Sequence, residues 1–325
     1  MRPRRARRWA PWVLALASGC DLIELPSLPA LPELPSRRPS LPTQPSMVPI
    51  PAPIPSPAPA PVVPPGRSMH LALGVPTDAS PQDELLLVKP QYVVSYNRFR
   101  NDPNWVAWRL TASDIGSVGR TQQTFSPDPQ LPVGVYRVYH RDYAGGGYDH
   151  GHLCPSAQRT ATVEDNAATF LTTNIVPQRH AINAGAWESL EQWSVERARE
   201  GWDLFIVAGG LWDRACATDL SPSGNVPSEA CPTLGRSPDP ARRVAIPVAT
   251  WKVIVMVPQG RGLDAVGPST PVVAVEMSNE AGSGRDWRRY LVSVDALEAR
   301  TGYDLLNLLP RELQARIEAQ PYQGD

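Results

Sequence analysis

The most constraining feature of this 325-residue chain is where its prolines lie. Residues 21–66 hold 16 of the 38 prolines, in repeats such as Leu-Pro and Pro-Ala-Pro. Proline lacks a backbone N–H and fixes φ, so this stretch can form neither a helix nor a central strand. We expect an extended, solvated tether, with a ligand for proline-reading domains as the alternative. A folded domain is therefore expected only over residues 67–325, which is enough chain for one large core.

The residues before the tether have the pattern of an export signal. Five arginines lie among the first eight residues, an apolar run covers residues 9–19, and Cys20 follows small residues. This pattern is typical of a secretory signal peptide, here residues 1–19, and the run is too short to cross a bilayer. Residues 17–20, Ala-Ser-Gly-Cys, resemble a bacterial lipobox. We therefore expect a lipid on Cys20 and a membrane-anchored protein in the periplasm or on the cell surface, with plain secretion as the alternative.

The remaining cysteines suit an exported domain. Cys216 and Cys231 bracket a loop rich in Ser, Pro, Gly and Asn, and we expect them to form a disulfide. A loop of this size gains about 3 kcal/mol of stability from such a bond. Cys154 is left over, and we expect a small buried thiol there.

The charge of the predicted domain limits how it can attract a polyanion. Seven of the 31 basic residues and three of the 32 acidic residues precede residue 67, which leaves 24 and 29 and a net charge of −5. A domain with this balance cannot hold a nucleic acid by its overall charge. Any attraction must be local, from a metal ion and a few arginines.

Strand patterns outnumber helix patterns in residues 67–325. Residues 91–96 and 105–110 are aromatic and β-branched runs that predict a hairpin. Because strands come in runs and helices are few, we predict an α+β fold with a mostly antiparallel sheet flanked by helices. The other predicted strands are residues 135–140, 169–176, 202–211, 243–248, 251–257 and 272–277. The predicted helices are residues 184–200, 293–300, and a terminal segment over 305–309 and 311–319.

Two of the five histidines lie close together on a turn that glycines make flexible. They belong to residues 147–156, Gly-Tyr-Asp-His-Gly-His-Leu-Cys-Pro-Ser. A neutral His152 could take a proton from a water that lies in line with a P–O bond. A structural or surface histidine is the alternative. Zinc is a second alternative, but no C-x-x-C or H-E-x-x-H spacing supports it. Its ligands would come from His140, His150, His152, His180 and Cys154.

An amide and a carboxylate follow about thirty residues later. Asn183 precedes a predicted helix, where it could cap the helix or offer its side-chain oxygen to Mg²⁺. Glu191 lies eight residues on, about 80° around an ideal helix, so its side chain could reach a metal-bound water. A solvated helix glutamate is the alternative for Glu191.

Together these segments resemble the DNA/RNA non-specific endonucleases, a ββα-metal family that includes mitochondrial endonuclease G. Residues 148–156 resemble the D-R-G-H signature of the family, and residues 166–178 resemble the strand that leads to its metal helix. Residues 183–191 match the helix motif at Asn183, Trp187 and Glu191. The resemblance covers residues 90–320, nearly all of the predicted domain.

The resemblance implies a ββα-metal active site and Mg²⁺-dependent hydrolysis of phosphodiester bonds in DNA and RNA, with Mn²⁺ as an alternative ion. It implies that His152 is the general base and that Asn183 is the direct metal ligand. Asn174 and Glu191 would support the water shell of the metal, and Asp149 would hold the first position of the signature.

One signature position departs from the family pattern. His150 stands where the family usually has an arginine near the scissile phosphate, and histidine carries less charge and lacks the bidentate guanidinium. The departure implies a lower activity, an activity that acid favours, or rescue by Arg159 or Arg179. Arg120 is the nearest match to a second family arginine, upstream of the Asp128-Pro129 pair.

The competing hypothesis is a weakly active or inactive extracellular nucleic-acid-binding module of the same fold. The retained His152 and Asn183 argue against lost chemistry, and the net charge of −5 argues against a pure binder. The resemblance also admits a cognate inhibitor protein as a partner, and it leaves the oligomeric state open.

Overall fold

The protein is described from a computed structural model, over residues 68–79, 81–120, 124–216, 230–280, 282 and 284–324. The predicted signal peptide, the Cys20 lipidation site and the proline-rich tether lie outside the described residues. No helix in the described part of the chain is long and apolar enough to cross a membrane.

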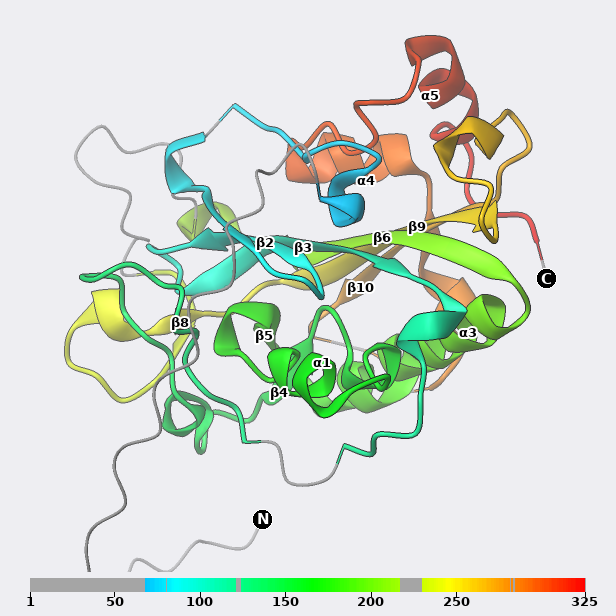
Figure 1. Ribbon diagram of the computed structural model, residues 1–325. Coiled ribbons are helices and arrows are strands. Elements are labelled where there is room, and N and C mark those ends of the chain that lie inside the picture. Colours follow the sequence, from blue (N-terminus) through cyan, green and yellow to red (C-terminus); the bar gives the residue numbers. More distant parts are fainter. Residues whose placement is uncertain are drawn as a thin grey trace, which may run out of the picture. The chain divides into compact units, whose positions relative to one another are not determined.

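A seven-stranded sheet in the order β1-β2-β3-β6-β9-β10-β11 forms the centre of the domain (Figure 1). Every neighbouring pair in it is antiparallel, as the α+β prediction requires. The long central strands are rich in valine, isoleucine and aromatic residues, which suit a pleated surface buried on both sides. The strands are β1 (Leu85–Val88), β2 (Val93–Asn97), β3 (Asp102–Leu110), β6 (Trp202–Leu211), β9 (Ala249–Pro258), β10 (Val272–Ser278) and β11 (Leu291–Val292).

Both faces of the sheet are covered, because successive side chains on a strand point to opposite sides. On β9, Trp251 and Val253 pack into one core cluster, whereas Ile254 packs into the other. Figure 1 shows α4 (Val294–Thr301) and α5 (Arg311–Ile317) over one face. The opposite face carries β4 (Asp149–His152), β5 (Ile175–Gln178), α1 (Val163–Ala168) and α3 (Glu188–Arg199).

Short elements complete the described chain. β7 (Thr233–Leu234) pairs with β8 (Val244–Ala245), and α2 (His180–Ile182) leads into a π-helical turn, η8 (Asn183–Trp187). The 3-10 turns are η2 (Met69–Leu71), η3 (Pro81–Asp83), η4 (Ala112–Asp114), η5 (His140–Tyr143), η6 (Ser156–Gln158), η7 (Thr172–Asn174), η9 (Arg214–Cys216), η10 (Pro240–Arg242), η11 (Leu263–Ala265) and η12 (Trp287–Tyr290).

The helix α4 forms where its end signals predict it. The Ser293 hydroxyl accepts a hydrogen bond from the Ala296 N–H, which satisfies a free donor of the first turn. Gly302 ends the helix with a left-handed φ of 82°, a conformation that favours glycine. Val294 and Leu297 pack its inner face against the sheet. The sequence prediction for this helix is confirmed to within one residue.

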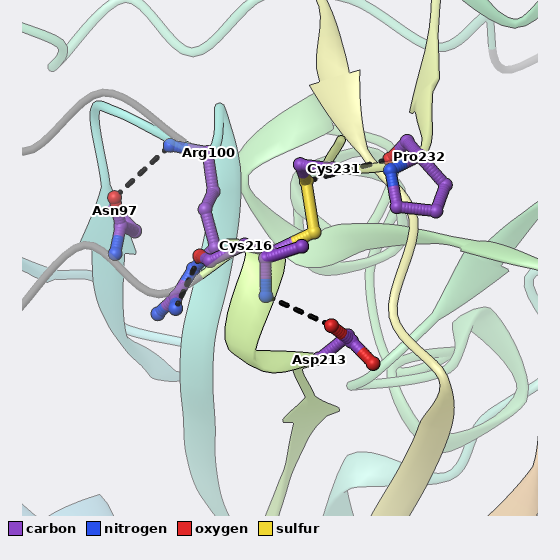
Figure 2. Close-up of a disulfide and its surroundings, with 7 residues drawn as sticks. Asn97, Arg100, Asp213, Cys216, Cys231 and Pro232 are labelled. Atoms are coloured by element: carbon purple, nitrogen blue, oxygen red, sulfur yellow. Dashed lines mark hydrogen bonds between the residues drawn. A yellow bond between two sulfur atoms is a disulfide. The ribbon is translucent and has the colours of Figure 1, made fainter. Parts of the chain in front are cut away.

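The predicted disulfide between Cys216 and Cys231 is present (Figure 2). The Arg100 guanidinium donates to the Cys216 carbonyl, so the bond is tied to the turn between β2 and β3. The Cys216 N–H is in turn held by the Asp213 carbonyl. Cys154 is a free, fully buried thiol, and burial raises its pKa to about 12. It is therefore inert at neutral pH, as expected.

Several predicted element boundaries are wrong. Residues 135–140 are not a strand, since the chain there is irregular until η5 begins. Residues 169–176 form the turn η7 before β5, because the Thr172 and Thr173 hydroxyls bond to Val138 and Asp128 and pull the backbone out of a strand. Residues 243–248 pair only over β8, and residues 305–309 are not helical. No strand was predicted at the position of β1.

Candidate active site

The two signature histidines lie on the short strand β4. β4 pairs antiparallel with β5, with Asp149 opposite Gln178 and His152 opposite Ile175. Residues two apart on a strand point to the same side, and the His150 and His152 rings both contact the Phe125 ring. Gly151 between them faces the Gln178 side chain so closely that a Cβ would collide with it. The glycine therefore permits the close pairing that presents both rings together.

His152 is enclosed and held neutral. Its ring lies 5.4 Å from the Phe125 ring and meets the Phe170 ring edge-on at 5.2 Å. Only 6% of the residue is exposed, and burial, together with the charge of Arg120, lowers its pKa to about 3. The Trp187 indole donates to the His152 carbonyl at 3.0 Å, which fixes this end of β4 to η8. Its Nε2 atom is buried and has no hydrogen-bond partner among the described residues.

Asn183 is oriented by the first residue of the signature. Its Nδ2 atom donates to Asp149 Oδ2 at 2.9 Å, and His180 Nδ1 lies 2.8 Å from the same oxygen. The amide nitrogen is thereby committed to Asp149, so the amide oxygen is left for another partner. Asn183 has helical backbone angles and its side chain caps nothing, so the N-cap interpretation is wrong.

The segment after Asn183 is not an ideal helix. Residues Asn183–Trp187 form a π turn, and Gly185 has φ −109° and ψ −116° at a kink. A Cβ at Gly185 would approach the Gly284 carbonyl oxygen to 2.8 Å, so only glycine fits without a shift. Single π turns of this kind are common at functional sites. The kink also means that the ideal-helix angle between Asn183 and Glu191 does not apply.

Glu191 lies in a buried ion pair that the sequence analysis did not foresee. Its side chain is only 13% exposed and Oε1 lies 3.7 Å from Lys252 Nζ, so the solvated-helix interpretation is wrong. Burial raises the pKa of Glu191 to about 7, opposed by the Lys252 charge. Lys252 is 1% exposed and lies 4.0 Å from the Trp187 ring centre. The available signal was a lysine inside an apolar strand, since a buried lysine needs a partner.

His150 sits in an aromatic stack. Its ring lies 4.2 Å from Phe125 and 4.1 Å from Tyr143, both nearly parallel, and 4.7 Å from the His140 ring. Burial and the neighbouring His140 lower its pKa to about 4, against a smaller opposing effect of Asp149. The imidazole is therefore neutral at physiological pH. It supplies no positive charge at the position where the family usually has an arginine.

The three predicted phosphate-binding arginines lie in different surroundings. Arg120 is exposed, with its guanidinium carbon 5.7 Å from the Phe170 ring, and its charge acts on both His152 and Glu191. Arg179 is exposed and stacks 4.1 Å above the Tyr148 ring.

Arg159 does not reach the site. It is 2% exposed, and its guanidinium donates to the backbone carbonyls of Gln91, Gln158 and Arg109. The prediction that Arg159 contacts substrate phosphate is therefore wrong, because all of this bonding is directed into the core.

Asn174 is also a structural residue. It is fully buried, its Oδ1 accepts from the Cys154 N–H, and its Nδ2 donates to the carbonyls of Cys154 and Thr169. Both amide hydrogens are used and the residue is fully buried within the protein, so the predicted role in the water shell is wrong. Asn174 instead fixes the chain directly after His152.

The zinc alternative has no geometric support. In the part of the chain that the structure describes, the one group of three metal-type side chains with ligand atoms within 4.8 Å of one another is Asp295, Glu298 and Glu318. None of these is a histidine. Asp295 and Glu298 lie in α4, and Glu318 directly follows α5. The His140 and His150 rings stack on each other, whereas the His152 ring meets the Phe125 and Phe170 rings at an angle, so the three histidines do not converge as ligands.

Comparison with known proteins agrees with this geometry. The family model for DNA/RNA non-specific endonuclease matches residues 71–312. A nuclease of Nostoc sp. is 41% identical over 261 residues, which cover 79% of this chain and 87% of that protein. A nuclease of Serratia marcescens is 27% identical over 78% of this chain and 85% of that protein. Human mitochondrial nuclease EXOG is 31% identical over a shorter part, 37% of this chain and 33% of that protein.

The fold has a solved counterpart. The structure of an EndoG/EndoGI complex aligns with a TM-score of 0.60 and 22% identity, over 75% of this chain and 92% of that one. At this identity the likeness shows the fold alone. The family model and the Nostoc relative both extend over most of the chain, and by these matches it belongs to the DNA/RNA non-specific endonuclease family and is a nuclease that hydrolyses nucleic acids.

Proposed function

We propose that this nuclease is Mg²⁺-dependent, with Mn²⁺ as an alternative ion, and cuts DNA and RNA internally with little choice of sugar or sequence. The observation that carries the proposal is the unpartnered, buried Nε2 of His152. A buried polar atom without a partner is costly, and it is tolerated where a reacting group or a water completes it. A neutral imidazole nitrogen is the form that can accept a proton.

The residues present suit a hard cation. Mg²⁺ takes oxygen ligands, keeps several waters and needs few protein groups. Asn183 turns its amide oxygen away from Asp149, because the amide nitrogen is bonded there. Glu191 Oε1 is buried without a hydrogen bond, although Lys252 lies 3.7 Å from it. We assign the direct ligand to Asn183 and the support of bound waters to Glu191.

The bound ion would supply Lewis-acid stabilisation of charge on the phosphate and on the leaving 3′ oxygen. His152 Nε2 takes a proton from the attacking water, and the Phe125 and Phe170 rings hold the imidazole in place. Asp149 fixes both Asn183 and His180 through one carboxylate oxygen. Arg120 and Arg179 are the exposed arginines that we assign to substrate phosphates. Phosphate contacts carry no sugar or base information, which fits a non-specific enzyme.

The test is cleavage of supercoiled plasmid and of RNA by the purified protein with Mg²⁺, with Mn²⁺ and with EDTA. We expect cutting with either ion and none with EDTA. Asn183→Ala should lower the rate about 100-fold or more, a typical loss for one electrostatic contact at a reacting centre. Gln192→Ala is the matched control, since it removes an exposed amide nearby on α3.

Calorimetric titration of Mg²⁺ into both variants gives a readout besides activity. We expect Asn183→Ala to weaken binding and Gln192→Ala to leave it unchanged. Cutting that survives chelation, or unchanged Mg²⁺ binding by Asn183→Ala, would contradict the metal assignment.

We further propose export, with residues 1–19 as the signal peptide, Cys20 as the lipid site, residues 20–66 as the tether and residues 67–325 as the endonuclease domain. The support is the arginine-rich start, the apolar run and the proline repeats. Mass spectrometry of the mature N-terminus in cell fractions tests this. An unprocessed cytoplasmic chain would contradict it.

The binding-module alternative predicts retained nucleic-acid binding with no cutting under any divalent ion. The observation that favours it is the neutral His150 in place of a charged group.

A cognate inhibitor protein remains a proposed partner. It is supported by the related fold of EndoG, whose crystal structure was solved in an inhibited complex with EndoGI.

A further inference from the structure

A large hollow lies beside the candidate active site and has no role in the chemistry. Its volume is about 1100 Å³, which is more than one nucleotide needs. It is lined by η3 and the start of β1, the turn between β2 and β3, residues 132–137, 139 and 141, and η10. The chain therefore brings together four segments that are distant in sequence around one open cavity.

The turn η5 connects this hollow to the active site. Tyr139 and Arg141 line the hollow. The rings of His140 and Tyr143, from the same turn, stack on His150 at 4.7 and 4.1 Å. His150 is two residues from His152 on β4, so a polymer held at the active site can continue into the hollow.

The charge of the hollow is positive, in a domain that is acidic overall. Its lining includes Arg98, Arg137, Arg141 and Arg242. Its acids are largely neutralised, since Asp83 lies 3.7 Å from the Arg100 guanidinium and Asp239 pairs with Arg242. Burial raises the pKa of the third acid, Glu84, to about 7. Among the described residues Arg98 and Arg141 have no ion pair, and Arg242 can exchange its exposed partner Asp239 for a phosphate.

The hollow also offers flat surfaces. Tyr139 is 37% exposed, and the Arg141 guanidinium lies 4.3 Å from its ring centre. The Arg98 guanidinium lies 4.7 Å from the Phe99 ring centre in the same way. Arginines stacked on aromatic rings, combined with exposed rings, are the surfaces on which unstacked bases of single strands bind.

We propose that this hollow binds single-stranded nucleic acid, as the part of the substrate that extends beyond the cleaved bond. The inference rests on the proposed function for its biological use, although binding is measured without catalysis. Arg98, Arg141 and Arg242 are exposed and contact phosphates. Tyr139 stacks on a base. Arg137 holds the Leu131 carbonyl at 2.9 Å and shapes the wall of the hollow.

The test is binding of a fluorescent single-stranded 40-mer in EDTA, across a series of salt concentrations. The full-length triple variant Arg98→Gln, Arg141→Gln, Arg242→Gln removes three charges from the hollow. Each lost phosphate contact flattens the slope of log K against log salt by about 0.7 for single strands, so we expect a change of about 2. The control triple variant is Arg199→Gln, Arg289→Gln, Arg316→Gln, which removes three exposed charges from α3, η12 and α5.

Equal slopes for the two triple variants would overturn the proposal, because the effect would then be one of overall charge. A greater loss of affinity for a 40-base-pair duplex than for the single strand would also overturn it. Cleavage of a tetranucleotide with Mg²⁺ separates the two proposals. The triple variant of the hollow should cut the tetranucleotide at the wild-type rate. If the wild-type enzyme cut no substrate at all, the proposed function would be contradicted. The binding measurements in EDTA would then still test whether the hollow holds single strands.

Discussion

The two faces of the central sheet are both closed to solvent, but they are built for different tasks. The face under α4 and α5 is packed mainly by aliphatic and aromatic side chains, with one ion pair, Arg109 and Asp203, at 2.7 Å. The opposite face, under β4, β5 and α3, also buries a charged pair, Glu191 and Lys252, and the neutral ring of His152. Several polar atoms there have no partner among the described residues, including His152 Nε2 and Glu191 Oε1. The α4 face therefore serves mainly packing, although Trp105 Nε1 and Asp203 Oδ1 also lack a partner in the described part of the chain, whereas the β4 face carries the titratable groups of the candidate site.

Two histidines make the contrast concrete. His70 lies on η2, which packs on the α4 side, and burial lowers its pKa to about 4. Its Nε2 lies 2.8 Å from the Pro90 carbonyl oxygen, and its Nδ1 accepts the Arg109 N–H at 3.1 Å. His152 has a pKa lowered to about 3 by the same cause, but its Nε2 is unpaired. Burial alone thus does not mark a functional histidine. An unused nitrogen narrows the choice to the two histidines of β4, because His150 Nε2 is unpaired as well within the residues that the structure describes.

The largest expected effect is the loss of turnover in His152→Ala. Removal of a general base typically costs 100- to 10,000-fold in rate. The deleted nitrogen has no hydrogen-bond partner among the described residues, so any fall in the melting temperature comes from the lost packing of the ring against Phe125 and Phe170. Plasmid cleavage rates and thermal melts measure the two effects.

His70→Ala is the matched control on the other face. It should keep wild-type cleavage and lose about 1–3 kcal/mol of stability, since it leaves a buried N–H unpaired. If both variants lost activity and stability alike, the distinction between the two histidines would not hold.

Shortening a buried side chain on the inner face of α4 should give the next largest effect, a loss of stability. Leu297 is 1% exposed and packs with Val294 against the sheet. Leu297→Ala should cost about 2–4 kcal/mol of unfolding free energy, because it removes buried surface and leaves a cavity. Cleavage at 25 °C should stay near the wild-type rate. Denaturant melts with a parallel cleavage assay test this, and a loss of rate without a loss of stability would show that the α4 face contributes to the chemistry.

Sequence patterns predicted the stabilising face well, because it follows from alternation and end signals. β6 was predicted residue for residue, and the predicted ends of α4 lie within one residue of those found. The signals were local, such as Ser293 before the helix and Gly302 after it. The irregular segment at residues 135–140 was mistaken for a strand, since its apolar residues pack into a small separate cluster. An apolar pattern predicts burial, but a strand also needs a neighbour to pair with.

The face under β4 and α3 was only partly predictable, because the groups of the candidate site are defined by contacts between distant residues. The motif identified His152, Asn183 and Asp149, but not the Asp149 hydrogen bond that orients the amide. The ion pair of Lys252 was not predicted, because its partner, Glu191, is 61 residues earlier in the chain. Arg159 was misplaced because a basic residue near a motif carries no sign of whether it points outward. Its backbone partners, Gln91 and Arg109, are 68 and 50 residues away.

His150→Arg should change activity by about tenfold, a smaller effect than the loss of the base. The wild-type ring is neutral between Phe125 and Tyr143, so an arginine would add a full charge and a bidentate donor near the phosphate. We expect a higher rate or a pH optimum moved upward, measured as kcat/KM on RNA from pH 5 to 9. His150→Gln, which adds no charge, is the control. If the arginine variant matched the glutamine variant, position 150 would not lie near the phosphate.

The smallest expected effect is a pH-dependent difference in stability between wild type and His70→Gln. Glutamine can accept the Arg109 N–H and donate to the Pro90 carbonyl, but it does not titrate. The wild-type histidine has a folded pKa of about 4, below the usual 6.5 of the unfolded chain. Below pH 6.5 the unfolded state therefore binds a proton that the folded state refuses, so wild-type stability falls relative to the variant until pH reaches about 4. Because His70 is partly exposed, we expect a relative loss of about 1–2 kcal/mol, measured by denaturant melts at pH 7, 5.5 and 4. A relative loss that appeared only above pH 7 would have the wrong sign, and it would show that His70 is charged in the folded protein.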